Sequence, residues 1–168
     1  YIPPRIWTYQ VNRLRAFLAD FLAHRQQVED CFRFCLIAYA HNAGSLAAAC
    51  RDGPIPSRRP FLVSRDLTGA RTGAIFHGSF SATASRFGIE GLLQRWLLAP
   101  GESLDGRGRG IRSLGAYFSM VSYVGLAYLL NFSMMRIDEA WSLRADCLEI
   151  ERDERFGPIY LFRGPTTK

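Results

Sequence analysis

Apolar residues in the first third of the chain recur at intervals of three and four, the spacing of one face of an α-helix. The pattern predicts two helices, one over residues 6–22 and one over residues 26–49. His24 and Arg25 interrupt the apolar positions, and we expect the two helices to separate there. The apolar positions are Ile6, Trp7, Val11, Leu14, Phe17, Leu18, Phe21, Leu22, Val28, Cys31, Phe32, Cys35, Leu36, Tyr39 and Ala40.

The middle of the chain holds turn-forming residues between short apolar stretches. Residues 51–60, RDGPIPSRRP, have neither a helical nor a strand period, and they predict a linker or an exposed basic loop. Residues 61–80 favour no single type of structure. Residues 81–98 predict one short amphipathic helix that ends before a Pro-Gly pair. Residues 104–110, LDGRGRG, predict a flexible basic loop.

Residues 114–135 are 22 consecutive positions without a charged side chain. By length alone, such a segment is a candidate membrane span. It also contains serines, an asparagine, glycines and tyrosines, and it runs directly into Arg136, Asp138 and Glu139. We therefore expect a central core helix that is buried on all sides, and no membrane partner.

The last third of the chain predicts a short helix followed by a β-hairpin. Residues 138–143 continue a helical pattern, and residues 145–146 turn the chain. Apolar and polar residues then alternate around 148–150 and 159–161, which predicts two antiparallel strands joined across 153–155.

The expected fold class is mainly α with a small antiparallel β-hairpin near the C-terminus, an α+β arrangement. The 168 residues and 19.0 kDa suit one ordinary domain or two small ones. We place a domain boundary at the basic linker, with a helical segment over residues 1–60 and a second domain over residues 61–168.

The charge of the chain is basic and unevenly distributed. Of the 21 basic residues, 20 are Arg and one is Lys168. A GC-rich genome accounts for most of the Arg excess, while Arg also suits phosphate binding because its planar fork donates two parallel hydrogen bonds. Residues 1–137 carry a net charge of +8 and residues 138–168 a net charge of −2. A basic surface attracts polyanions, nucleic acid before an anionic membrane.

The cysteines indicate packing rather than metal binding. Their spacing, with no nearby His, matches no zinc motif. Cys31 and Cys35 are four apart in a helical pattern, so we expect both on one face as small core residues. No secretory leader heads the sequence, and a reducing cytoplasm is the expected location.

Arg136 and Glu139 are three positions apart on a predicted helix, so their side chains share a face. At the end of a long apolar helix we expect both near the core, where an Arg needs a partner. Glu139 could then hold one edge of the guanidinium and leave the other edge for an oxyanion. An ordinary helix salt bridge is the alternative.

The surrounding string resembles the first active-site segment of the tyrosine recombinases, the phage integrase family. The resembling residues are RIDEAWSLRAD over 136–146, then two strands, then Lys168. In that family an apolar helix ends in Arg, followed by x-x-Glu, a Leu and an Asp that turns into a β-sheet, with a catalytic Lys in the sheet hairpin about thirty residues later. The resemblance covers 111–168. The family often has a Gly before the Arg, where this chain has Met134 and Met135.

The resemblance implies a role for each matched residue. Arg136 would bind the scissile phosphate, Glu139 would orient Arg136, and Lys168 would protonate the departing 5′ hydroxyl. The family needs no cofactor or metal, and it joins DNA through a 3′-phosphotyrosine. No tyrosine of this chain matches the nucleophile, so we expect an inactive N-terminal and central fragment of such an enzyme.

The expected partners are double-stranded DNA and further copies of the protein assembled on it. Residues 1–60 would then be the end of the family's helical DNA-clamping domain. Candidate DNA contacts are Arg13, Arg58, Arg59, Arg107 and Arg109. The alternative is a non-catalytic basic helical protein that binds DNA or acts as a scaffold, with Arg136 and Glu139 as a structural pair.

Overall fold

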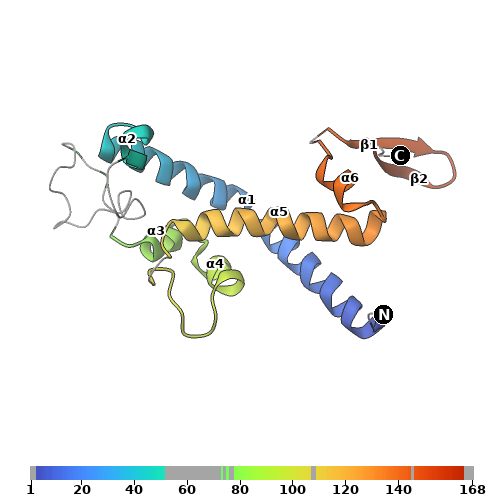
Figure 1. The fold of residues 1–168 in the computed structure, drawn as a ribbon, viewed down its shortest axis with the longest axis horizontal. Helices are drawn as coiled ribbons and strands as arrows, with labels where there is room; N and C mark the ends of the chain where they lie inside the picture. Colours follow the sequence, from blue (N-terminus) through green and yellow to red (C-terminus); the bar gives the residue numbers. More distant parts are fainter. Residues whose placement is uncertain are drawn as a thin grey trace. The chain divides into compact units, whose positions relative to one another are not determined.

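The computed structural model describes residues 3–51, 73, 75, 78–106, 109–144 and 146–164, with the side chains of residues 50 and 51 excepted. The described part of the chain is mainly helical with one two-stranded sheet, which confirms the expected fold class (Figure 1). The elements are α1 (Pro4–Ala43), α2 (Leu46–Arg51), α3 (Phe80–Arg86), α4 (Glu90–Leu97), α5 (Arg112–Ser133), α6 (Ile137–Trp141), β1 (Leu148–Asp153) and β2 (Gly157–Phe162).

The chain divides into two compact units. The first unit comprises residues 1–16 and 122–168, and the second comprises residues 17–121. The domain boundary expected between residues 60 and 61 falls outside the described residues.

Helix α1 is continuous, so the expected break at His24 and Arg25 was wrong. No Pro or Gly lies inside the helix after its first residue, and nothing in the backbone forces an interruption. Polar side chains bridge successive turns at this point instead. Arg25 Nε donates to Glu29 Oε1 at 3.0 Å, and Gln26 Nε2 donates to Asp30 Oδ1 at 3.0 Å. Such pairs four residues apart stabilise a helix through a stretch that lacks apolar positions.

The second unit contains nearly all of the buried apolar side chains among the described residues. Phe17 lies at its centre, edge-on to Trp96 with ring centroids 5.0 Å apart and tilted against Tyr117 at 5.5 Å. Cys31 and Cys35 are buried and free, which confirms the expectation that they are core residues. The buried apolar residues of this unit are Phe17, Val28, Cys31, Cys35, Ala38, Ala49, Phe80, Ala84, Ile89, Leu92, Leu93, Leu104, Leu114 and Tyr117.

Residues 81–98 form parts of two helices rather than the single expected helix. Gly88 adopts a φ of +73°, a conformation that glycine takes at little cost and that ends α3. The amide of Ile89 donates to the carbonyl of Ala84 at 2.9 Å across this turn. The apolar spacing continued through the glycine, which is why periodicity alone joined α3 to α4.

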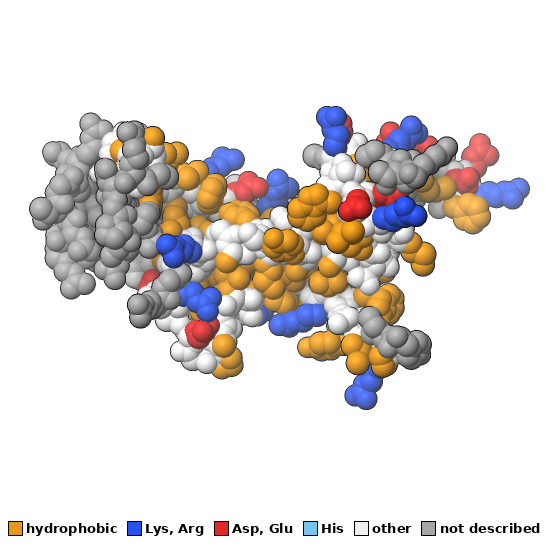
Figure 2. All heavy atoms as spheres, in the orientation of Figure 1, with side chains coloured by type: hydrophobic (Ala, Val, Ile, Leu, Met, Phe, Trp, Pro, Cys, Tyr) orange, Lys and Arg blue, Asp and Glu red, His pale blue; other side chains and the backbone are white. Residues whose placement is uncertain are grey.

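Helix α5 has the expected length, but the expectation that it is buried on all sides was wrong. Its buried residues are Ser113, Leu114 and Tyr117, all in its first two turns. Hydrophobic side chains are visible at its surface (Figure 2). By length and composition α5 is the one helix of the described chain able to cross a membrane, and a single such helix is a weak indication.

Strands β1 and β2 form the expected antiparallel hairpin. Asp153 pairs with Gly157, so residues 154–156 make the turn, one position later than the expected 153–155. The Asp153 carboxylate accepts hydrogen bonds from the amides of Arg155 at 2.8 Å and Phe156 at 3.0 Å, which fixes the turn. The amide of Arg163 donates to the carbonyl of Cys147 at 2.8 Å and continues the pairing beyond the strands.

The first unit exposes most of its large apolar side chains. Val11 and Ala140 are its buried apolar residues among those described. The cross-strand pairs of the hairpin place four apolar side chains on one exposed face, namely Leu148, Ile150, Tyr160 and Phe162.

Asp20 joins α1 to α4 in the second unit. Its Oδ2 accepts hydrogen bonds from Arg95 Nη1 at 2.7 Å and from Trp96 Nε1 at 2.9 Å. The Trp96 bond and then the Arg95 bond and charge hold the pKa of Asp20 below its ordinary value of 3.8, against the effect of burial. Because the folded pKa is lower than the unfolded one, the ionised Asp20 stabilises the fold at neutral pH, and this contribution disappears as the pH falls through the folded pKa.

We predict that Asp20→Asn lowers the free energy of unfolding by about 2 kcal/mol at pH 7, since a hydrogen-bonded charge is lost. Urea unfolding at pH 7 and at an acid pH measures the effect, and the difference should shrink as the pH falls and wild-type Asp20 becomes protonated. Asp30→Asn on the same helix is the control and should change stability by less than about 0.5 kcal/mol. An equal loss at both pH values would contradict the ionic role of Asp20.

Candidate functional site around Arg136

The backbone between α5 and α6 reverses direction at Met134. Ser133 Oγ donates to the carbonyl of Leu129 at 2.7 Å and accepts from the amide of Met135 at 3.4 Å. Met134 has a φ of +53°, the left-handed conformation that a side chain disfavours, and it is 93% exposed. Helix α5 therefore ends at Ser133, three positions before Arg136, and a new helix starts directly after Arg136.

Arg136 is the residue that precedes the first turn of α6, and its own backbone is extended. Its carbonyl accepts from the amide of Ala140 at 2.9 Å, and its amide donates to Glu139 Oε2 at 3.0 Å. Both polar groups of its backbone are therefore bonded. This is the half of a capping box in which the acid at the third helical position reaches back to the preceding amide.

The expectation that Arg136 lies near the core was wrong, because its side chain is exposed, and Glu139 is half-buried. Among the described residues, no ion pair joins the guanidinium of Arg136 to the carboxylate of Glu139. The expected geometry assumed one unbroken helix, on which the two side chains would meet. The reversal at Met134 instead places Arg136 ahead of α6, where the carboxylate meets an amide that has no helical partner.

An open hollow of about 540 Å³ lies beside α6 in the first unit. Its lining is mostly apolar and comes from α5 and α6, with Asp138 as its one charged residue. Periodicity did not reveal this hollow, because it depends on the angle between two helices that the sequence joined into one segment. The lining residues are Tyr123, Leu126, Ile137, Asp138, Trp141 and Ser142.

The exit of the hairpin lies beside the ends of two side chains, those of Leu143 and Met135. A β-carbon added to Gly164 would lie 2.9 Å from Leu143 Cδ2 and 4.0 Å from Met135 Cε. The absence of a side chain at Gly164 thus allows the chain leaving β2 to approach both residues. Residues that are far apart in the sequence are in this way brought to one place in the first unit.

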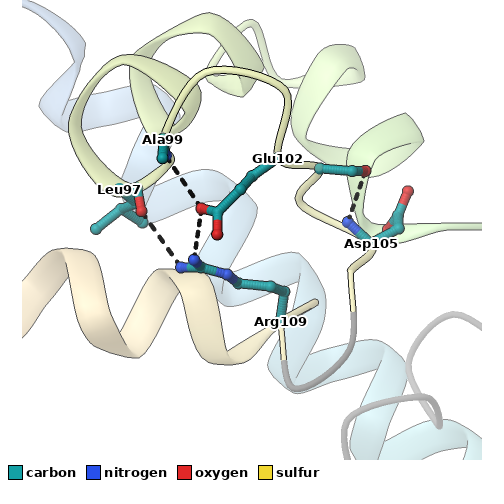
Figure 3. A network of polar contacts seen from close by, with 6 residues as sticks. Leu97, Ala99, Glu102, Asp105 and Arg109 are labelled. Carbon is teal, nitrogen blue, oxygen red and sulfur yellow. Dashed lines mark hydrogen bonds and ion pairs between the residues drawn. The ribbon is translucent and has the colours of Figure 1, made fainter.

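Arg109 is held by protein groups in the loop after α4 (Figure 3). Its Nη2 donates to Glu102 Oε2 at 2.7 Å, and its Nη1 donates to the carbonyl of Leu97 at 3.3 Å. The amide of Ala99 also donates to Glu102, and this bond, followed by Arg109, lowers the pKa of Glu102. The guanidinium therefore closes the loop, a structural role that its position in a glycine-rich basic string did not predict.

Of the other candidate site residues, the structure describes only Arg13. Arg13 lies exposed on α1. Lys168, Arg58, Arg59 and Arg107 lie outside the described residues. Within the described part of the chain, no cluster of three or more His, Cys, Asp or Glu side chains could hold a metal ion.

No protein-family model, no curated protein and no solved structure matches this chain. The family resemblance thus depends on the matched residues of the sequence alone.

We predict that Met134→Gly raises the free energy of unfolding by about 1 kcal/mol, because glycine removes the cost of the left-handed backbone while an exposed side chain is lost. Thermal or urea unfolding measures the change. The control is Met135→Gly, next in the chain and without a positive φ, which should destabilise the protein. If Met134→Gly destabilises to the same extent, the backbone of Met134 is not strained.

Proposed function

We propose that this chain forms part of a DNA strand-breaking and rejoining enzyme of the tyrosine recombinase type. In this proposal Arg136 binds the scissile phosphate and Lys168 protonates the leaving 5′ oxygen. The partner is double-stranded DNA, on which several copies assemble, the expected location is the cytoplasm, and no cofactor takes part.

The approach of Gly164 to Met135 and Leu143 is the observation that carries the proposal. Lys168 follows Gly164 by four residues, a stretch that spans at most about 14 Å when fully extended. Because Met135 is next to Arg136 in the sequence, this approach supports a return of the chain toward the arginine. A site that needs an arginine and a lysine at one phosphate requires such a return.

The exposed guanidinium of Arg136 suits the first role. A phosphodiester under attack gathers charge on its non-bridging oxygens, and a planar fork can donate to two of these oxygens at once. Since both backbone groups of Arg136 are bonded within α6, the start of the side chain is held while its end remains at the surface.

The second role is proton donation. In the proposed reaction a tyrosine, which the matched residues do not include, loses its hydroxyl proton to a base, and its oxygen forms a bond to phosphorus. The bond from phosphorus to the 5′ oxygen breaks, and that oxygen takes a proton. A lysine ammonium can supply this proton, whereas a guanidinium is too weak an acid to do so. This chemistry gives a reason for a lysine, rather than an arginine, at position 168 of an arginine-rich chain.

We predict that Arg136→Ala reduces DNA nicking about 100- to 1000-fold in the protein extended to its natural C-terminus, because one transition-state charge donor is lost. DNA binding should change little, since many contacts share the phosphate backbone. Nicking of a suicide substrate and a filter-binding assay measure the two properties. Arg144→Ala, which removes another exposed arginine of the same unit, is the control and should nick normally. Full activity of Arg136→Ala would refute the assignment.

We also predict that Lys168→Ala loses about 100-fold or more in nicking of ordinary DNA. It should recover on a substrate whose 5′ bridging oxygen is replaced by sulfur, because a thiol of pKa about 8.5 leaves without a proton donor. Arg136→Ala should show no such recovery. A Lys168→Ala enzyme that stays inactive on the sulfur substrate would contradict the role of leaving-group acid.

A further inference from the structure

We propose that Glu139 positions Arg136 through the backbone amide of Arg136 and not through its guanidinium. This inference rests on the proposed function, in which Arg136 binds a DNA phosphate. In place of the expected ion pair, Glu139 bonds to the main chain of Arg136, and the whole guanidinium is available to the phosphate.

The hydrogen bond from Arg136 N to Glu139 Oε2 is the geometric basis of the proposal. The two atoms are 3.0 Å apart, and the Arg136 carbonyl is bonded to the Ala140 amide on the other side. These two bonds fix the backbone at which the side chain of Arg136 begins. Met134, two residues before Arg136, is in a left-handed conformation, so the local backbone cannot relax into a longer α5 without breaking this arrangement.

The position of the carboxylate also explains why it does not need to touch the guanidinium. An ion pair along one edge of Arg136 would occupy donors that a bidentate phosphate contact uses. A carboxylate that bonds to the amide leaves all five N–H groups of the guanidinium for the ligand.

A hydrogen bond to the Arg136 amide and an ion pair with the guanidinium require different properties of the side chain at position 139. A cap needs an acceptor oxygen at the end of a side chain of this length, and Gln supplies one as Glu does. An ion pair needs the negative charge, which Asp keeps and Gln lacks. Glu139→Gln and Glu139→Asp therefore separate length from charge at this position.

The first experiment measures single-turnover nicking by the protein extended to its natural C-terminus. We expect Glu139→Gln to nick within about threefold of wild type. Glu139→Asp and Glu139→Ala should each lose about 100-fold in rate with DNA affinity nearly unchanged, because the arginine is misplaced rather than removed. Asp138→Asn is the matched control, since it removes a neighbouring charge from the same helix without an observed bond to the Arg136 amide, and it should behave as wild type.

Loss of activity in Glu139→Gln equal to that in Glu139→Ala would overturn the proposal, because the charge would then be what matters. Wild-type activity in Glu139→Ala would overturn it as well, because no positioning would be needed.

The second experiment measures the hydrogen bond between Glu139 and the Arg136 amide and needs no DNA cleavage. Amide hydrogen exchange at Arg136 should be about tenfold faster in Glu139→Ala than in wild type and nearly unchanged in Glu139→Gln. Unchanged exchange in Glu139→Ala would refute the cap itself. If the extended wild-type protein nicks no DNA, the proposed function fails, and the exchange result still decides whether Glu139 holds this amide.

Discussion

The reversal of the chain between α5 and α6 is the constraint on which the candidate site depends. Helix α5 stops where Met134 takes a left-handed conformation, and Ser133 bonds both to the helix behind it and to the amide ahead of it. The start of α6, the exposed position of Arg136 and the hollow between α5 and α6 follow from this turn. A straight continuation of α5 would leave the Arg136 amide with a helical partner and Glu139 without its present bond.

The two units differ in what stabilises them. The second unit has a buried aromatic and aliphatic core, together with Asp20, which accepts hydrogen bonds from Arg95 and Trp96. The first unit has few buried apolar side chains among its described residues, and local hydrogen bonds define its shape. These local hydrogen bonds are those of the Asp153 turn, of the paired strands and of the Glu139 cap. The candidate site thus lies in the part of the chain where backbone bonds, rather than core packing, determine side-chain positions.

The role of each arginine depends on the groups that surround it in the folded chain. The glycine-rich basic string around Arg109 suggested a nucleic-acid contact, yet Arg109 bonds to Glu102 and to a backbone carbonyl in its own loop. Arg95 likewise bonds to Asp20, which lies 75 positions earlier in the chain. Arg136 has an exposed side chain and a bonded backbone, a combination suited to an external anion. The partners that the fold brings to each arginine decide which of these roles it has, and a count of charges does not contain that information.

Local patterns in the sequence determined the helical character of the chain, the hairpin with its three-residue turn and the burial of Cys31 and Cys35. Each depends on interactions between near neighbours or on the spacing of one helical face, so composition and periodicity are sufficient. Tertiary structure decided that α1 continues through His24, that Gly88 separates α3 from α4, and that most of α5 is not buried. It also decided that Glu139 bonds to an amide and that Gly164 approaches Met135. These features depend on backbone conformation at single residues and on contacts between distant segments, which a pattern of apolar and polar positions does not specify.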